Sequence, residues 1–148
     1  MNEKLIYSSK FEDIYFDSQM REALQIWNEN TTLLNDSLLK EEQVKMAELF
    51  EEFKPLFHLA DARKFFYPIS PEIQHWINTE IAARIKIGGV RRSAMVLPEE
   101  FIAALGVEQL GEEIGDAQSS KKNKSDTYDY DVAVFSSLEE AREWFKNS

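Results

Sequence analysis

The chain has 148 residues, of which 43% are hydrophobic, and carries a net charge of -10 at pH 7. This length predicts one domain over residues 1–148, with a core that buries roughly two-thirds of the unfolded surface. The acidic balance argues against nucleic acid as a partner, and the absence of cysteine excludes disulfides, thiolate metal sites and thiol nucleophiles.

The N-terminal half begins with an expected strand meander. Three short runs at 5–9, 11–16 and 23–27 are rich in Ile, Tyr, Phe and Trp, which favour strands. A helix is then expected from a cap at Asp36 or Ser37 to about Phe53, because apolar side chains recur three and four residues apart. Pro55 ends this helix.

The apolar run 56–60 is short and nearly continuous, which is typical of a strand buried on both faces of a sheet. Ser70 followed by Pro71 predicts the cap and first residue of a second helix, with a stripe of Ile residues four apart. We expect Gly88 and Gly89 to end that helix.

The C-terminal third alternates strands and helices. Residues 90–97 and 130–135 predict strands, and 99–114 predict a helix broken at Gly106. The polar segment 118–130 is expected to be a mobile loop, and Ser137 with Glu140 predicts a capping box for the last helix. Because helical crossovers join parallel neighbours, the fold class is α/β, a single mixed sheet with an antiparallel meander followed by parallel strands.

Four segments carry a resemblance to a known family: LADAR (59–63), PISPEIQ (68–74), SAMVLP (93–98) and VFSSLEEAREWF (134–145). Their order and spacing resemble the STAS-like group, small bacterial proteins related to anti-sigma-factor antagonists. The resemblance covers almost the whole chain and implies a STAS-like domain. It also implies a regulatory role, or, through related folds that carry lipids, a role in binding apolar ligands.

Ser70 is a candidate phosphorylation site by this resemblance. In the antagonists a Ser at the start of a helix, within a D-S-S-G motif, is phosphorylated to switch partner binding. Ser70 occupies an analogous place, but the surrounding motif is absent. Its role as a helix cap explains the residue without phosphorylation.

The segment between the strand at 56–60 and the helix at Ser70 is the candidate recognition face. Asp61 and Arg63 could form an anion hook, or a salt bridge that anchors the loop. Phe65, Phe66 and Tyr67 exceed what a turn needs. These rings could plug the core, line an apolar pocket or form a dimer contact.

Catalytic and metal sites are not indicated by the residues. With two histidines and no Cys, a transition-metal site would need both His58 and His75 plus carboxylates, so His58 is interpreted as a hydrogen-bonded core or interface residue. No nucleophile elbow, dinucleotide fingerprint or Walker loop occurs in the sequence. The sequence predicts no cofactor and no enzyme.

Two functional hypotheses therefore stay open beside the less favoured one of an enzyme. The first is a cytoplasmic, self-associating interaction module, a homodimer that binds an unidentified protein partner. The second is a binding protein for a small apolar or anionic ligand, with the three rings as pocket walls and Arg63 as a charged hook. The chain has neither the apolar core of a signal peptide at its start nor an apolar run long enough to span a membrane.

Overall fold

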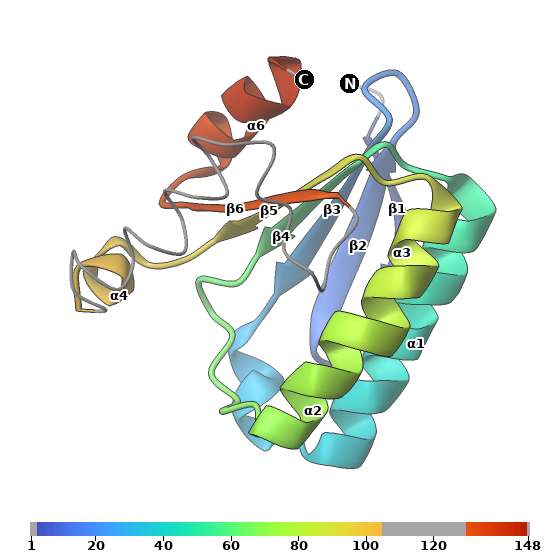
Figure 1. Cartoon of the computed structure of the whole chain (residues 1–148). Coiled ribbons are helices and arrows are strands. Elements are labelled where there is room, and N and C mark those ends of the chain that lie inside the picture. Colours follow the sequence, from blue (N-terminus) through green and yellow to red (C-terminus); the bar gives the residue numbers. More distant parts are fainter. Residues whose placement is uncertain (1–2, 105–129, 148) are drawn as a thin grey trace.

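The computed structural model describes residues 3–104 and 130–147, and the six strands within these ranges form one sheet (Figure 1). The spatial order of the strands follows the chain, β1-β2-β3-β4-β5-β6. The first three strands pair antiparallel, and β3 to β6 are parallel. This arrangement confirms the predicted α/β class. The strands are β1 (Glu3–Ser8), β2 (Glu12–Asp17), β3 (Glu22–Trp27), β4 (Phe57–Asp61), β5 (Arg92–Val96) and β6 (Asp131–Phe135).

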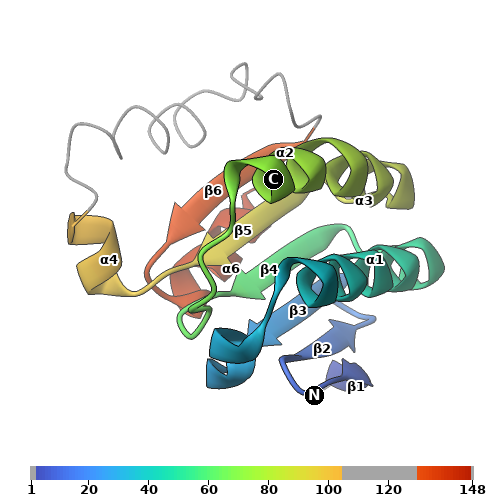
Figure 2. The same ribbon diagram turned by 90° about the horizontal axis from the view of Figure 1, so that it is seen from below.

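Helices cover both faces of the sheet, as Figures 1 and 2 show. One face carries α1 (Asp36–Phe53) beside a continuous helical run. That run consists of α2 (Pro71–Trp76), a π-helical turn (Ile77–Ile81) and α3 (Ala82–Gly88). The opposite face carries α6 (Leu138–Lys146) over β4, β5 and β6. The short α4 (Glu99–Ala104) stands apart from the other helices, and a 3-10 turn (Glu29–Leu33) precedes α1.

The start of α1 differs from the sequence prediction by one residue. Asn35 is the cap: its backbone is extended and its side-chain oxygen accepts a hydrogen bond from the Leu38 N–H at 2.8 Å. Asp36 is the first helical residue, where a carboxylate is favoured by the helix dipole. The prediction of Asp36 or Ser37 was wrong because three consecutive residues are all good caps, and only the backbone conformation selects one.

The second helix begins as predicted, with Ser70 as cap and Pro71 at the first position. The Ser70 hydroxyl oxygen accepts a hydrogen bond from the Ile73 N–H at 3.2 Å. The helical run ends at Gly88, and Gly89 is its C-cap, with a φ of 110° that favours glycine. The π-helical turn in its middle has no counterpart in the predicted pattern, which shows only the apolar stripe.

Two clusters of buried side chains form most of the core, one on each face of the sheet. Ile14, Met46 and Phe50 pack with Ile81 and Ile85 beneath α1 and α3. On the other face, α6 packs on the sheet through a cluster that also includes strand residues: Leu24, Leu59, Ala94, Val96, Ala141 and Phe145.

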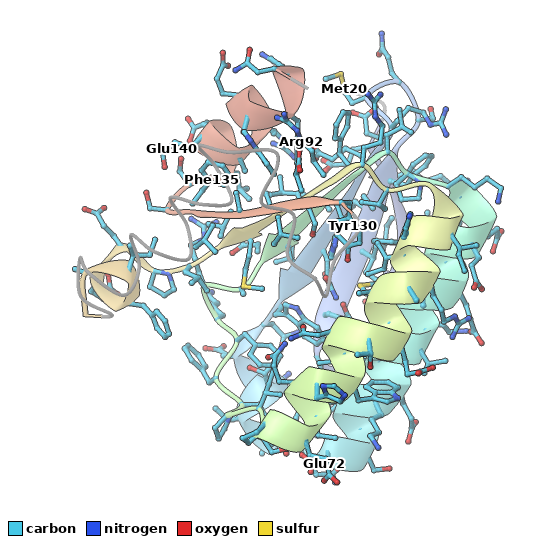
Figure 3. All side chains as sticks on the ribbon, viewed as in Figure 1. Met20, Glu72, Arg92, Tyr130, Phe135 and Glu140 are labelled. Atoms are coloured by element: carbon cyan, nitrogen blue, oxygen red, sulfur yellow. The ribbon has the colours of Figure 1, made fainter. Side chains whose placement is uncertain are left out.

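The C-terminal elements agree in part with the prediction. Ser137 caps α6 by accepting from the Glu140 N–H, but the Glu140 carboxylate accepts from Ser136. The predicted helix beyond residue 104 and the predicted loop at 118–130 lie outside the described residues. Tyr130 is the exception, and it is buried in the core cluster beneath α1 and α3 (Figure 3).

Candidate ligand-binding cavity

A cavity of about 530 Å³ lies between the sheet and the helices of the α1 face. Its volume falls within the roughly 300–1,000 Å³ range of small-molecule sites, which are mostly apolar with a few convergent polar groups. The lining has the same character: apolar side chains predominate, and the polar ones include three from the strands and two glutamines, Gln43 and Gln74, from the helices. The principal lining residues are Gln25, His58 and Ser93 from the sheet, Met46, Ile77, Ile81, Ala82 and Ile85 from the helices, and Phe65, Phe66 and Tyr67 from the loop.

The polar side chains of the floor form one hydrogen-bonded chain across four strands. Gln25 Nε2 on β3 donates to Glu12 Oε1 on β2 at 2.8 Å. Gln25 Oε1 lies 2.8 Å from His58 Nε2 on β4, and His58 Nδ1 lies 3.1 Å from Ser93 Oγ on β5. Glu12, Gln25 and His58 are buried, whereas Ser93 is partly exposed. Ser93 is therefore the end of the hydrogen-bonded chain that opens into the cavity.

The other end of the hydrogen-bonded chain is a pair of buried acids, Glu12 and Glu42. Glu12 is fully buried on β2, and burial followed by hydrogen bonding to Glu42 raises its pKa well above the ordinary value. The Glu42 side chain on α1 accepts from the Ser9 hydroxyl at 3.0 Å and from the Tyr7 hydroxyl at 3.2 Å. Within the described residues, Glu12 Oε2 has no N–H or O–H partner. A neutral Glu12 can therefore carry its proton on Oε2, directed to Glu42, and accept with Oε1.

The directions of the remaining bonds follow from this arrangement. Because Glu12 Oε1 accepts from the Gln25 amide nitrogen, the Gln25 oxygen faces His58. Burial lowers the pKa of His58 to about 4, so its ring is neutral at pH 7 and carries one proton. The facing Gln25 oxygen assigns that proton to Nε2. Nδ1 then accepts a hydrogen bond from the Ser93 hydroxyl.

The Ser93 and His58 pair has the composition of a nucleophile and a base, but its environment suits neither role. A histidine with a pKa of about 4 is a weak general base at neutral pH. Ser93 also lies within β5, whose backbone pairs with strands on both sides. The pair is better suited to holding a hydrogen-bonded molecule than to removing a proton from one.

The loop that carries Phe65, Phe66 and Tyr67, between β4 and α2, lines the cavity and also closes part of the core. Phe65 packs edge-on against Trp27 with ring centroids 5.0 Å apart, while 53% of Phe66 is exposed. The Tyr67 hydroxyl donates to Asp36 at the start of α1. The buried Thr31 joins the loop to the 3-10 turn, because its hydroxyl donates to the Lys64 carbonyl at 2.9 Å and accepts from the Phe66 N–H at 2.9 Å.

Asp61 and Arg63 form a bidentate pair, with Arg63 Nη2 2.7 Å from Asp61 Oδ2 and Arg63 Nε 2.9 Å from Oδ1. The Arg63 N–H also donates to Asp61 Oδ1 at 3.2 Å. Burial raises the pKa of Asp61, but the bonds from Arg63 outweigh it and hold the pKa below its ordinary value. Both residues line a separate hollow with Pro98, Glu99 and Glu100, and neither lines the cavity. This geometry matches the loop-anchor interpretation.

Several of the residues that build the site were not singled out from the sequence. Gln25 interrupts the apolar run of its strand, which was an available signal, whereas Glu12 and Ser93 each have a charged neighbour in their strands and do not stand out. The sequence does not show that these side chains share one face and one row with His58. The interpretation of His58 as a hydrogen-bonded core residue agrees with its position. Ser70 caps α2 and does not line the cavity.

Comparisons with known proteins add no relative to this geometry. The chain matches no family model, no curated protein and no solved structure. Among residues 3–104 and 130–147, no group of three or more His, Asp or Glu side chains could hold a metal ion. In the same ranges, no helix combines the length and apolar character needed to cross a membrane.

Proposed function

We propose that the protein binds a small, uncharged and largely apolar molecule in the cavity between the sheet and the helices on its α1 face. The observation that carries the proposal is the cavity itself, about 530 Å³ with mostly apolar helix and loop walls and a hydrogen-bonding floor. Ligand sites are typically built in this way, because apolar walls provide affinity and a few polar groups fix orientation.

The lining favours an uncharged ligand. In the described part of the chain, the cavity wall includes no Asp, Glu, Lys or Arg, and burial keeps His58 neutral at pH 7. A charged molecule would lose hydration there without gaining an opposite charge, which is unfavourable. The anionic ligand with Arg63 as its hook is therefore not part of the proposal, since Arg63 is paired with Asp61 in another hollow.

The test uses the fluorescence of N-phenyl-1-naphthylamine, an uncharged apolar probe, titrated with the full chain at pH 7. We expect its emission to rise and saturate, and its sulfonated analogue 8-anilinonaphthalene-1-sulfonate to bind at least about tenfold more weakly. If the uncharged probe shows no saturable binding, or if the two probes bind equally, the proposal is wrong.

A matched pair of variants on α3 locates the probe. Ala82 is buried and lines the cavity, whereas its neighbour Ala83 is exposed. Ala82→Phe places a ring in the cavity and should weaken binding of N-phenyl-1-naphthylamine by about tenfold or more, while Ala83→Phe should leave it unchanged. Far-UV circular dichroism checks that both variants fold. Equal effects of the two substitutions would show that the probe binds elsewhere.

The other functional predictions from the sequence stay predictions. They are the STAS-like relationship, the regulatory interaction with a protein partner, the cytoplasmic location, the homodimer and the phosphorylation of Ser70. Light scattering at micromolar concentration tests the homodimer, and a monomer throughout would contradict it. A phosphate mass shift on Ser70 in protein taken from its native host would support the switch.

A further inference from the structure

The hydrogen-bonded chain on the cavity floor has a direction, and that direction limits the ligand. The Gln25 amide nitrogen donates to Glu12, which leaves the Gln25 oxygen to accept from His58 Nε2. His58 Nδ1 is then an acceptor, and among the described residues it faces the Ser93 hydroxyl at 3.1 Å. The single hydroxyl proton of Ser93 is therefore directed to His58.

Ser93 meets the cavity with its oxygen lone pairs. A hydroxyl has one proton to donate and two lone pairs that accept. Ser93 is partly exposed at the cavity, whereas Gln25 is 2% exposed and His58 is 7% exposed. A ligand group that reaches Ser93 therefore meets a hydrogen-bond acceptor. If the ligand group is itself only an acceptor, the Ser93 oxygen and the ligand atom face each other with no proton between them, and no hydrogen bond forms.

We propose that Ser93 selects a ligand that carries a hydroxyl or N–H donor, and that His58 positions Ser93 for this role. This inference rests on the proposed function of the same cavity. It adds the class of ligand, an uncharged apolar alcohol, phenol or amine, and it excludes ethers and ketones of the same shape as preferred ligands. Selection by an unpaired polar group is effective, because a ligand lacking the matching group leaves the buried acceptor unsatisfied.

The test compares three uncharged competitors of similar shape that displace N-phenyl-1-naphthylamine from the full chain at pH 7. They are 1-naphthol, which donates, 1-methoxynaphthalene, which only accepts, and 1-methylnaphthalene, which does neither. We expect 1-naphthol to bind about tenfold more tightly than either of the others, as one satisfied hydrogen bond allows. This comparison needs no variant.

Three variants then assign the preference to Ser93 and His58. Ser93→Ala should abolish the difference between 1-naphthol and 1-methylnaphthalene, while the exposed-serine control Ser8→Ala should retain it. His58→Phe keeps a ring but frees the Ser93 proton, so Ser93 can then also donate to 1-methoxynaphthalene, and the preference for 1-naphthol over that ether should shrink. The ratio of the two affinities is a readout that a general loss of packing, which weakens both ligands, would not change.

The outcomes separate this inference from the proposed function. If N-phenyl-1-naphthylamine binds but the wild-type chain does not discriminate among the competitors, the inference is wrong and the cavity proposal stands. If 1-methoxynaphthalene is preferred, the hydrogen-bonded chain runs in the opposite direction and Ser93 is a donor, which also overturns the inference. If neither N-phenyl-1-naphthylamine nor any competitor binds, the cavity proposal itself fails.

Discussion

Burial of an uncharged His58 should make the stability of the fold sensitive to acid, and His58→Gln should remove that sensitivity. Burial lowers the pKa of His58 from 6.5 to about 4. Between these two values the unfolded chain binds a proton that the folded chain does not, so this contribution to stability falls as the pH falls. It is complete above pH 6.5 and lost by pH 4.

The size of the effect follows from the shift. Each unit of pKa difference corresponds to about 1.4 kcal/mol, so the shift of His58 corresponds to a total of about 3 kcal/mol. About 2 kcal/mol of this should be lost between pH 7 and pH 5. A glutamine at position 58 does not titrate, so the stability margin of the wild type over His58→Gln should shrink by that amount.

Urea denaturation followed by far-UV circular dichroism at pH 7, 6 and 5 measures this margin. Taking the difference between the two proteins cancels the titration of groups that both share. The control is His75→Gln, which removes an exposed histidine from α2. A margin between wild type and His58→Gln that stays constant with pH would refute the burial of an uncharged His58 in the sheet.

Three further predictions concern other parts of the structure. Because burial and Glu42 raise the pKa of Glu12, the wild type should lose stability as the pH rises through that pKa. Glu12→Gln should therefore gain stability relative to the wild type between pH 4 and pH 8 in urea denaturation, and a difference that stays constant with pH would contradict the raised pKa. A Cβ at Gly88 would lie 3.0 Å from the backbone oxygen of Phe50, so Gly88→Ala should lower the free energy of unfolding by about 1–2 kcal/mol. The control Ile87→Ala, at an exposed side chain, should be nearly neutral. A Gly88→Ala variant more stable than the wild type would contradict the close approach. Ser70→Ala should cost about 1 kcal/mol in the same assay, and Ser70→Asp, which keeps a capping oxygen, should cost less; equal losses would argue against the cap.

Local sequence signals predicted much of the fold because they act over a few residues. Ser70-Pro71 starts a helix and Gly88-Gly89 ends it, since a capping hydroxyl, a fixed proline φ and a positive glycine φ are properties of the residues themselves. The same kind of signal was ambiguous at the start of α1, where neighbouring residues compete for one cap and the path of the chain selects Asn35.

The candidate site was less predictable because its residues are distant in sequence. Gln25, His58 and Ser93 are separated by 33 and 35 positions, and no local motif links them. Strand order and register bring them into one row, and a shift of one residue in any strand would turn that side chain to the other face. No local pattern encodes the register between strands.

The sequence by itself determined the order of elements, the parallel crossovers and an aromatic run larger than a turn requires. It left the role of Phe65, Phe66 and Tyr67 open among a core plug, a pocket wall and an interface. Only the tertiary structure decided that these rings border a cavity, because the space beside them depends on how closely the helices pack on the sheet. The same packing buries Glu12, Gln25 and His58, and the orientation of the Gln25 amide between its two neighbours gives the hydrogen bonds the direction from which the ligand class is inferred.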